Sequence, residues 1–246
     1  MIKKTRNMQA LFLGKLDYLE SMILQEEINL KSQTNVFDQK ILFLEHSNVI
    51  TYGSQVKISK EEIERLNFID NNFLHVISNR GGEVTLHNPG QLICYPIIDI
   101  KKHFSGILEY VKFIEEVIIK TLEHYNVLAH RVKKRRGIWV NGISNENYDK
   151  NSIPAGEKIA ALGLKVIRNI SMHGFALNIY NDLEVYKKII PCGMPNLKVT
   201  SIQKVSDKKY DLEDVALIIT SKFEEILGLK LDFKKILIDR KKWLKH

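Results

Sequence analysis

The sequence predicts an α/β fold, of the α+β kind, in which a mixed β-sheet is flanked by helices. Short β-rich apolar runs dominate the middle of the chain, and longer helical patterns interrupt and follow them. The chain has 246 residues, 44% of them hydrophobic, which is enough for a sizeable core. Because no repeat and no Pro/Gly/Ser-rich linker divides the sequence, we expect residues 1–246 to form a single domain.

Three segments have the residue spacing of helices. Residues 16–31 carry acidic residues between apolar ones, and residues 107–122 have apolar residues three and four positions apart. The last helix is expected from about Asp211, a preferred N-cap residue, to Gly228, a preferred stop. The apolar positions that define the first two are Tyr18, Leu19, Met22, Ile23 and Ile28, and Ile107, Val111, Ile114, Ile118 and Leu122.

Strands are expected wherever a short apolar run is rich in β-branched or aromatic residues. Residues 171–178, which combine polar residues with Gly174, are interpreted mainly as a turn that leads into the last of these runs. Residues 141–156 are the most loop-like stretch and are expected to connect two strands. The runs cover residues 40–44, 73–77, 91–98, 137–141, 158–167 and 175–179.

The net charge of +8, from 37 basic and 29 acidic residues, favours acidic partners. Nucleic acids and acidic carrier proteins both meet this description. The basic residues are spread along the chain except in two runs, residues 133–136 and 239–245, and a charge run is usually a solvated face. We therefore expect no nucleic-acid binding.

Cysteine content and hydropathy indicate a cytoplasmic protein. Two cysteines are too few for a disulfide framework, and the basic N-terminus is followed by no hydrophobic stretch of signal-peptide length. No segment approaches the ~18 apolar residues of a membrane span, so no membrane partner is expected.

Cys192 and Lys158 are the residues that suggest thiol chemistry. Cys192 lies between proline and glycine in residues 191–194, a turn composition that exposes a sulfur. A thiol with a pKa of roughly 8.5 needs a nearby cation to become a nucleophilic thiolate at neutral pH. Lys158, which opens the apolar run 158–166, could be that cation, or a base. Spacing alone does not separate this from an ordinary turn cysteine and a lysine that caps a strand.

A glycine-rich segment, residues 80–91, lies between two of the apolar runs. Its paired glycines allow a ligand close to the backbone, and Arg80, Thr85 and His87 offer directional donors. The glycine spacing matches neither a Walker loop nor a dinucleotide-binding fingerprint. Taken alone, the segment is typical of a polar turn.

Taken in order, several motifs resemble those of the lipoyl(octanoyl) transferases. The resemblance spans roughly residues 40 to 202. The motifs are Glu45-His46 with Thr51-Tyr52-Gly53, Arg80-Gly81-Gly82 through Gly90-Gln91, Gly137-Ile138-Trp139-Val140, Lys158 through Gly163, His173 through Asn178, Pro191-Cys192-Gly193 and Val199-Thr200-Ser201.

This resemblance implies the catalytic-domain fold of the biotin and lipoate protein ligases. It implies transfer of an octanoyl group from octanoyl-acyl carrier protein to a lysine of lipoyl domains, the first step of endogenous protein lipoylation. The expected acceptors are the lipoyl domains of 2-oxoacid dehydrogenase complexes and the glycine cleavage H protein. No cofactor is expected.

Residue by residue, the resemblance makes Cys192 the nucleophile that becomes the acyl-thioester and Lys158 the partner that lowers its pKa. It places His46 and His173 near the site without assigning them a role. The implied substrate-binding residues are Arg80, Gly81, Gly82, Glu83, Val84, Thr85, Leu86 and His87, then Ala161, Leu162 and Gly163, then Gly174, Phe175 and Ala176.

Other cysteine and histidine positions are expected to be structural. Cys94 lies in an apolar run and is expected to pack as a small hydrophobic residue, and the histidines lack metal-ligand spacing. The alternatives to the transferase are an ATP-dependent lipoate or biotin ligase on the same fold, an enzyme that moves octanoyl between lipoyl domains, and a basic nucleic-acid-binding module.

Overall fold

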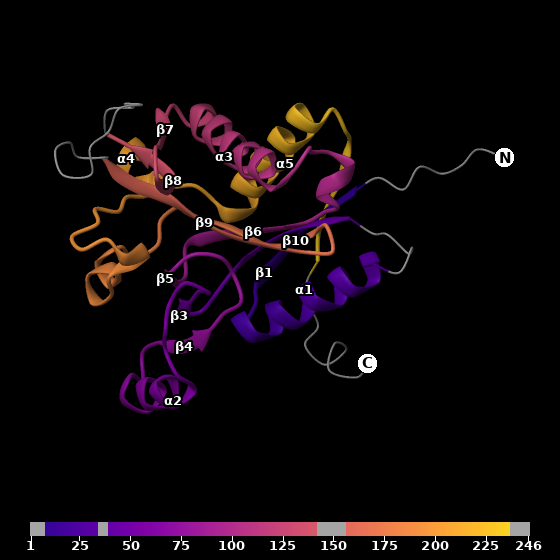
Figure 1. The fold of residues 1–246 in the computed structure, drawn as a ribbon. Coiled ribbons are helices and arrows are strands. Elements are labelled where there is room, and N and C mark those ends of the chain that lie inside the picture. The colour runs from indigo at the N-terminus through magenta and orange to yellow at the C-terminus, as the bar shows by residue number, and fades with distance from the viewer. Residues whose placement is uncertain (1–7, 34–38, 142–155, 237–246) are drawn as a thin grey trace.

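The computed structural model describes residues 8–33, 39–141 and 156–236. In these ranges the chain forms a mixed eight-stranded sheet and a three-stranded sheet, with helices on both faces of the larger one (Figure 1). This arrangement confirms the predicted mixed sheet flanked by helices.

The large sheet is mixed, and its C-terminal strand lies at one edge beside the N-terminal strand. It consists of β1 (Met8–Lys15), β2 (Lys40–Glu45), β6 (Gln91–Ile97), β7 (Ala129–Val132), β8 (Arg135–Val140), β9 (Glu157–Ile167), β10 (Ile170–Asn178) and β11 (Leu231–Lys235). Their order is β11-β1-β2-β6-β10-β9-β8-β7. β1 pairs in parallel with β11 and β2, and the other neighbours are antiparallel.

The small sheet holds the glycine-rich segment. Its order is β4-β3-β5, with β3 (Val49–Tyr52) in the centre, β4 (Leu74–Ile77) and β5 (Val84–His87). The adjoining α2 (Lys60–Ile69) begins with a capping box between Ser59 and Glu62. That four-residue signature is visible in the sequence and would have predicted this helix.

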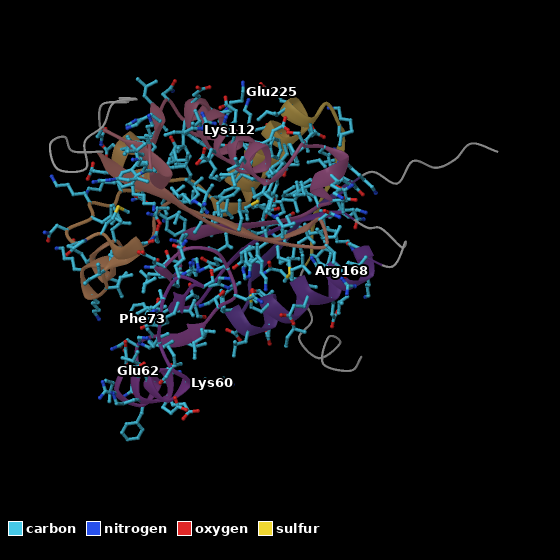
Figure 2. All side chains as sticks on the ribbon, in the orientation of Figure 1. Lys60, Glu62, Phe73, Lys112, Arg168 and Glu225 are labelled. Carbon is cyan, nitrogen blue, oxygen red and sulfur yellow. The ribbon has the colours of Figure 1, made fainter. Side chains whose placement is uncertain are left out.

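Two helices cover one face of the large sheet, and a third covers the other (Figure 1). The first two are α3 (Ile107–His124) and α5 (Leu212–Leu227), and the third is α1 (Tyr18–Gln33). Figure 2 shows Lys112 and Glu225 on the α3 and α5 layer. Arg168, in the turn after β9, lies beside α1 and donates to Gln33 at 3.1 Å.

The predicted ends of α5 are confirmed. The side chain of Asp211 accepts a hydrogen bond from the Glu213 backbone N–H at 2.8 Å, and Gly228 closes the helix with φ +65°. The main core lies between this helix layer and the sheet, and it includes the completely buried Cys94, as predicted. Among the described helices, none combines the length and apolarity needed to cross a membrane.

The predicted apolar face of α1 is partly wrong. Leu19 and Ile23 are more than half exposed, whereas Gln25 and Asn29 face the sheet. The reason is that the sheet presents polar backbone groups to this helix. Gln25 accepts a hydrogen bond from the backbone N–H of His173, which has φ +56° in β10, at 2.7 Å.

Residues 171–178 belong to the buried strand β10, so their interpretation as a turn is wrong. Gly174 is required there by close strand packing and not by a change of chain direction. A Cβ at this position would lie 2.0 Å from the carbonyl oxygen of Cys94 in β6. The polar residues of the segment are buried because neighbouring elements satisfy them: Ser171 donates to the Pro96 carbonyl at 2.8 Å.

Gly174→Ala is expected to destabilise the protein by about 3 kcal/mol or more, because a methyl group would push β10 away from β6. Urea unfolding measures this loss. The matched control is Gly106→Ala, where an added Cβ meets nothing within 4 Å and the expected cost is below about 1 kcal/mol. Equal losses for the two variants would contradict this explanation.

Candidate active site

A cavity of about 740 Å³ lies where the small sheet meets one end of the large one. Its walls come from α1, β5, β6, β8, β9 and β10 and from residues 193–198. Most of the residues that the sequence analysis named as site residues meet in this cavity. They are Arg80, Gly82, Glu83, Val84, Thr85, His87, Lys158, Ala161, Leu162, Gly163, Gly174, Phe175 and Ala176.

Two named residues lie outside the cavity wall, and one side chain lies outside the described structure. Gly81 donates its backbone N–H to the Leu164 carbonyl at 3.1 Å. Leu86 is completely buried in a separate apolar cluster with Ile50 and Tyr186. Cys192 is placed by its backbone in the 3₁₀ turn η3 (Pro191–Gly193), but its side chain is not among those described, nor is the loop at residues 142–155.

Backbone pairing places the segment that follows Cys192 beside Lys158. The Lys158 N–H donates to the Lys198 carbonyl at 2.9 Å, and the Thr200 N–H donates to the Lys158 carbonyl at 3.0 Å. Residues 198–200 therefore run alongside the start of β9, in parallel with it. This pairing, which no local sequence pattern predicts, brings Gly193 and Lys158 to the wall of one cavity.

The side chain of Lys158 is held by an aromatic ring and a glycine. It is only 5% exposed, and its Nζ lies 5.6 Å from the centre of the Trp139 ring, within cation–π range. A Cβ on Gly137, whose φ is +119°, would lie 2.3 Å from Lys158 Cε. Met194 and Leu197 pack against the small apolar cluster that Trp139 forms with Val132. The sequence analysis included Trp139 in a motif but predicted no contact for it.

Arg80 braces the glycine-rich segment from within. Its guanidinium donates to the carbonyl oxygens of Thr51 at 2.6 Å, Glu83 at 2.7 Å and Gly81 at 3.1 Å, and it is 7% exposed. These bonds fix the backbone that forms one wall of the cavity. Sequence reasoning treated this arginine as a donor for ligands, whereas most of these donors bind the protein itself.

Glu83 reaches across to the turn that carries Cys192. A Cβ added to Gly193 would lie 2.1 Å from Glu83 Oε2, so the carboxylate rests directly against this glycine. Among the described residues, Glu83 Oε2 is buried without a hydrogen-bond partner. Gly193 has φ +62°, a backbone conformation that favours glycine. The contact therefore couples the glycine-rich segment to η3.

Histidines and tyrosines form the inner end of the cavity. His46 lies behind it, donating through Nδ1 to the Leu16 carbonyl at 2.7 Å and accepting through Nε2 from the Tyr95 hydroxyl at 2.9 Å. His173 donates to Asn79 Oδ1 at 2.6 Å, and His87 donates to Gln91 Oε1 at 2.8 Å. Tyr18 stacks on His87 with 6.1 Å between ring centres.

Burial keeps these three histidines uncharged. Desolvation lowers the pKa of His46 to about 4. It also lowers the pKa of His87 and of His173 to about 3, with nearby Arg80 adding to the effect in both. The inner end of the cavity is therefore polar in its hydrogen bonding but carries no histidine charge at neutral pH. In the described part of the chain, no cluster of three His, Cys, Asp or Glu side chains could hold a metal ion.

Comparison with known proteins shows the family to which the chain belongs. The model of the lipoyl protein ligase A/B catalytic domain matches residues 17–224. The chain belongs to this family. Within the family it is similar to the octanoyltransferase of Desulforamulus reducens, with 35% identity over 94% of this chain and 93% of the relative. The octanoyltransferase of Koribacter versatilis is 36% identical over 90% of this chain and 87% of the relative.

Solved structures of lower identity share the fold. A bipartite lipoate protein ligase from Thermoplasma acidophilum gives a TM-score of 0.66 at 14% identity, covering 96% of this chain and 89% of that one. The biotin protein ligase of Aquifex aeolicus gives 0.54 at 14% identity, covering 89% and 70%. The family and its octanoyltransferase relatives make this protein an acyltransferase that transfers octanoyl groups in protein lipoylation.

Gly193→Ala is expected to slow octanoyl transfer and to cost about 1–2 kcal/mol of stability, because φ +62° disfavours a side chain and the new methyl group displaces the end of the Glu83 side chain. Rates of octanoyl transfer and urea unfolding measure the two effects. Gly228→Ala is the matched control, since its φ of +65° is similar but nothing lies within 4 Å; its cost is about 1 kcal/mol.

The double variant Glu83→Ala/Gly193→Ala tests the contact itself. Removing the carboxylate makes room for the methyl group, so the double variant is expected to recover part of the stability that Gly193→Ala loses. Strictly additive losses would show that the Glu83 contact is not the cause.

Stability is expected to fall between pH 7 and pH 5. The unfolded chain takes up histidine protons near pH 6.5, whereas the folded chain, with pKa values of about 3 to 4, does not. Each buried histidine then costs about 2 kcal/mol at pH 5. Urea unfolding at several pH values measures the slope, and His46→Gln is expected to remove one histidine's share. An unchanged slope in that variant would refute the assignment.

Proposed function

We propose that this protein moves an octanoyl group from octanoyl-acyl carrier protein to a lysine of a lipoyl domain, through a thioester on Cys192. The observation that carries the proposal is that one cavity is lined by Lys158, by the glycine that follows Cys192 and by an apolar wall. The proposed acceptors are lipoyl domains of 2-oxoacid dehydrogenase complexes and of the glycine cleavage H protein.

The apolar wall suits a saturated acyl chain. Ile93, Leu162, Phe175 and Ala176 line the cavity, and its volume lies in the range of small-molecule sites. Gly163 and Gly174 are paired across β9 and β10, and both line the cavity. The uncharged histidines at the inner end add no ionic group that burial of an alkyl chain would have to desolvate.

The proposed reaction has two acyl-transfer steps at this site. In the first, the Cys192 thiolate attacks the carrier thioester, the new C–S bond forms, and the carrier thiolate leaves and takes up a proton. A Lys158 ammonium would stabilise the Cys192 thiolate before attack. In the second, the acceptor amine attacks the Cys192 thioester, the C–N bond of the amide forms and the Cys192 C–S bond breaks. The amine proton passes to a base, and we assign this role to Lys158 after its ammonium has given its proton to the departing carrier thiolate.

The competing proposal is an ATP-dependent ligase, because solved ligase structures share the fold, among them lipoate-protein ligase A bound with ATP. A ligase reaction needs no nucleophilic cysteine. The identity to the octanoyltransferases, about twice that to this ligase, favours the transferase.

Incubation with octanoyl-acyl carrier protein in the absence of ATP is expected to add one octanoyl group to Cys192, detected by intact mass and peptide mapping. Cys192→Ala is expected to remain unmodified, whereas Cys94→Ala, a change at a buried cysteine, retains the adduct. Lys158→Ala is expected to slow acylation and move its pH profile to higher pH, since the thiol loses a nearby cation. An adduct that requires ATP, or forms equally on Cys192→Ala, would overturn the proposal.

A further inference from the structure

Positive charge is concentrated at the wall of the cavity. Among the described residues that line it, six are basic and only Glu83 is acidic. The six basic residues are Arg80, Lys134, Arg135, Arg136, Lys158 and Lys198.

The six basic residues occupy two depths. Arg80 and Lys158 are buried, the first within the glycine-rich segment and the second against Trp139. The other four form what we call the cationic rim: Lys134, Arg135, Arg136 and Lys198. Lys134, Arg136 and Lys198 are exposed and Arg135 is half-buried.

Two independent parts of the chain supply the cationic rim. Lys134, with φ +64°, lies in the tight turn between β7 and β8, and Arg135 and Arg136 begin β8. Lys198 comes from the segment that pairs with Lys158. The backbone bond between Lys198 and Lys158 fixes the backbone of one rim residue beside the buried lysine.

The cavity thus changes from apolar at its wall of β9 and β10 to cationic at the rim. A ligand that matches this gradient has an alkyl chain at one end and an anion at the other. A thioester on a phosphopantetheine arm has this form, because a phosphodiester follows the acyl group and the pantetheine. An acceptor lysine is positively charged, as the rim is, so the cationic rim would repel it.

We propose that the cationic rim binds the phosphate of the phosphopantetheine arm that delivers the acyl group, and so gives the enzyme its preference for a phosphate-bearing donor. This inference rests on the proposed function, since it assumes that the donor is a carrier thioester. Arginine and lysine bind phosphate oxygens through charge-assisted hydrogen bonds, and exposed cations make such binding sensitive to salt.

The test compares two small donors that differ only in the phosphate: octanoyl-pantetheine and octanoyl-4′-phosphopantetheine. The wild-type protein is expected to acylate Cys192 with a kcat/KM about five- to ten-fold higher for the phosphorylated donor at low salt, and the preference is expected to shrink as salt rises. Lys134→Ala/Arg136→Ala is expected to lose most of this preference.

Lys208→Ala/Lys209→Ala is the matched control. Like the rim variant, it removes two positive charges, but from an exposed loop whose residues do not line the cavity. It is expected to keep the preference for the phosphorylated donor. If the rim variant keeps the full preference, or if both double variants lose it equally, the cationic rim is not the phosphate site. Thermal unfolding of each variant checks that the fold is intact.

A binding measurement separates this inference from the proposed function. Calorimetric titration with unacylated 4′-phosphopantetheine requires no thioester chemistry and is expected to show binding to the wild-type protein that the rim variant weakens about five-fold or more. If no donor acylates Cys192 but this binding pattern holds, the proposed function fails and the phosphate site stands. If acylation occurs but unphosphorylated pantetheine binds equally well, the phosphate site is refuted.

Discussion

The backbone pairing between Lys158 and residues 198–200 is the constraint on which the site depends. Two hydrogen bonds attach the segment that follows Cys192 to the start of β9, so the candidate nucleophile's turn, the buried lysine and Lys198 share one wall. The pairing forms between a strand and a loop distant in the sequence, so it exists only once β9 has taken its place in the large sheet.

Rigid contacts on either side of this pairing shape the cavity. Arg80 donates to one backbone carbonyl in β3 and to two in the loop before β5, and Trp139 and Gly137 contact the Lys158 side chain. The Glu83 carboxylate resting on Gly193 joins the glycine-rich segment to η3. These contacts are made within the protein, so residues of the chain itself position the wall of the cavity.

The buried histidines affect both the charge of the site and the stability of the fold. Desolvation keeps His46, His87 and His173 neutral. Each of them donates a hydrogen bond from one ring N–H to an acceptor in the protein. Their neutrality keeps positive charge at the lysine and the cationic rim, where a thiolate or phosphate would meet it. The cost is a fold whose stability decreases under mildly acidic conditions.

The sequence by itself determined the mixed fold class, the caps of α5 at Asp211 and Gly228, and the ordered motifs that identified the family, because these are local patterns. The organisation of residues 1–246 as one domain and the roles of Cys192 and Lys158 remain predictions. Tertiary structure alone decided that β10 is a strand throughout and that α1 presents amide side chains to the sheet. It also decided that Leu86 packs in a cluster outside the cavity, whereas Trp139 and Lys134 line the cavity. Each of these depends on what a distant segment presents to the residue, and that is settled by packing and by the pairing of buried polar groups.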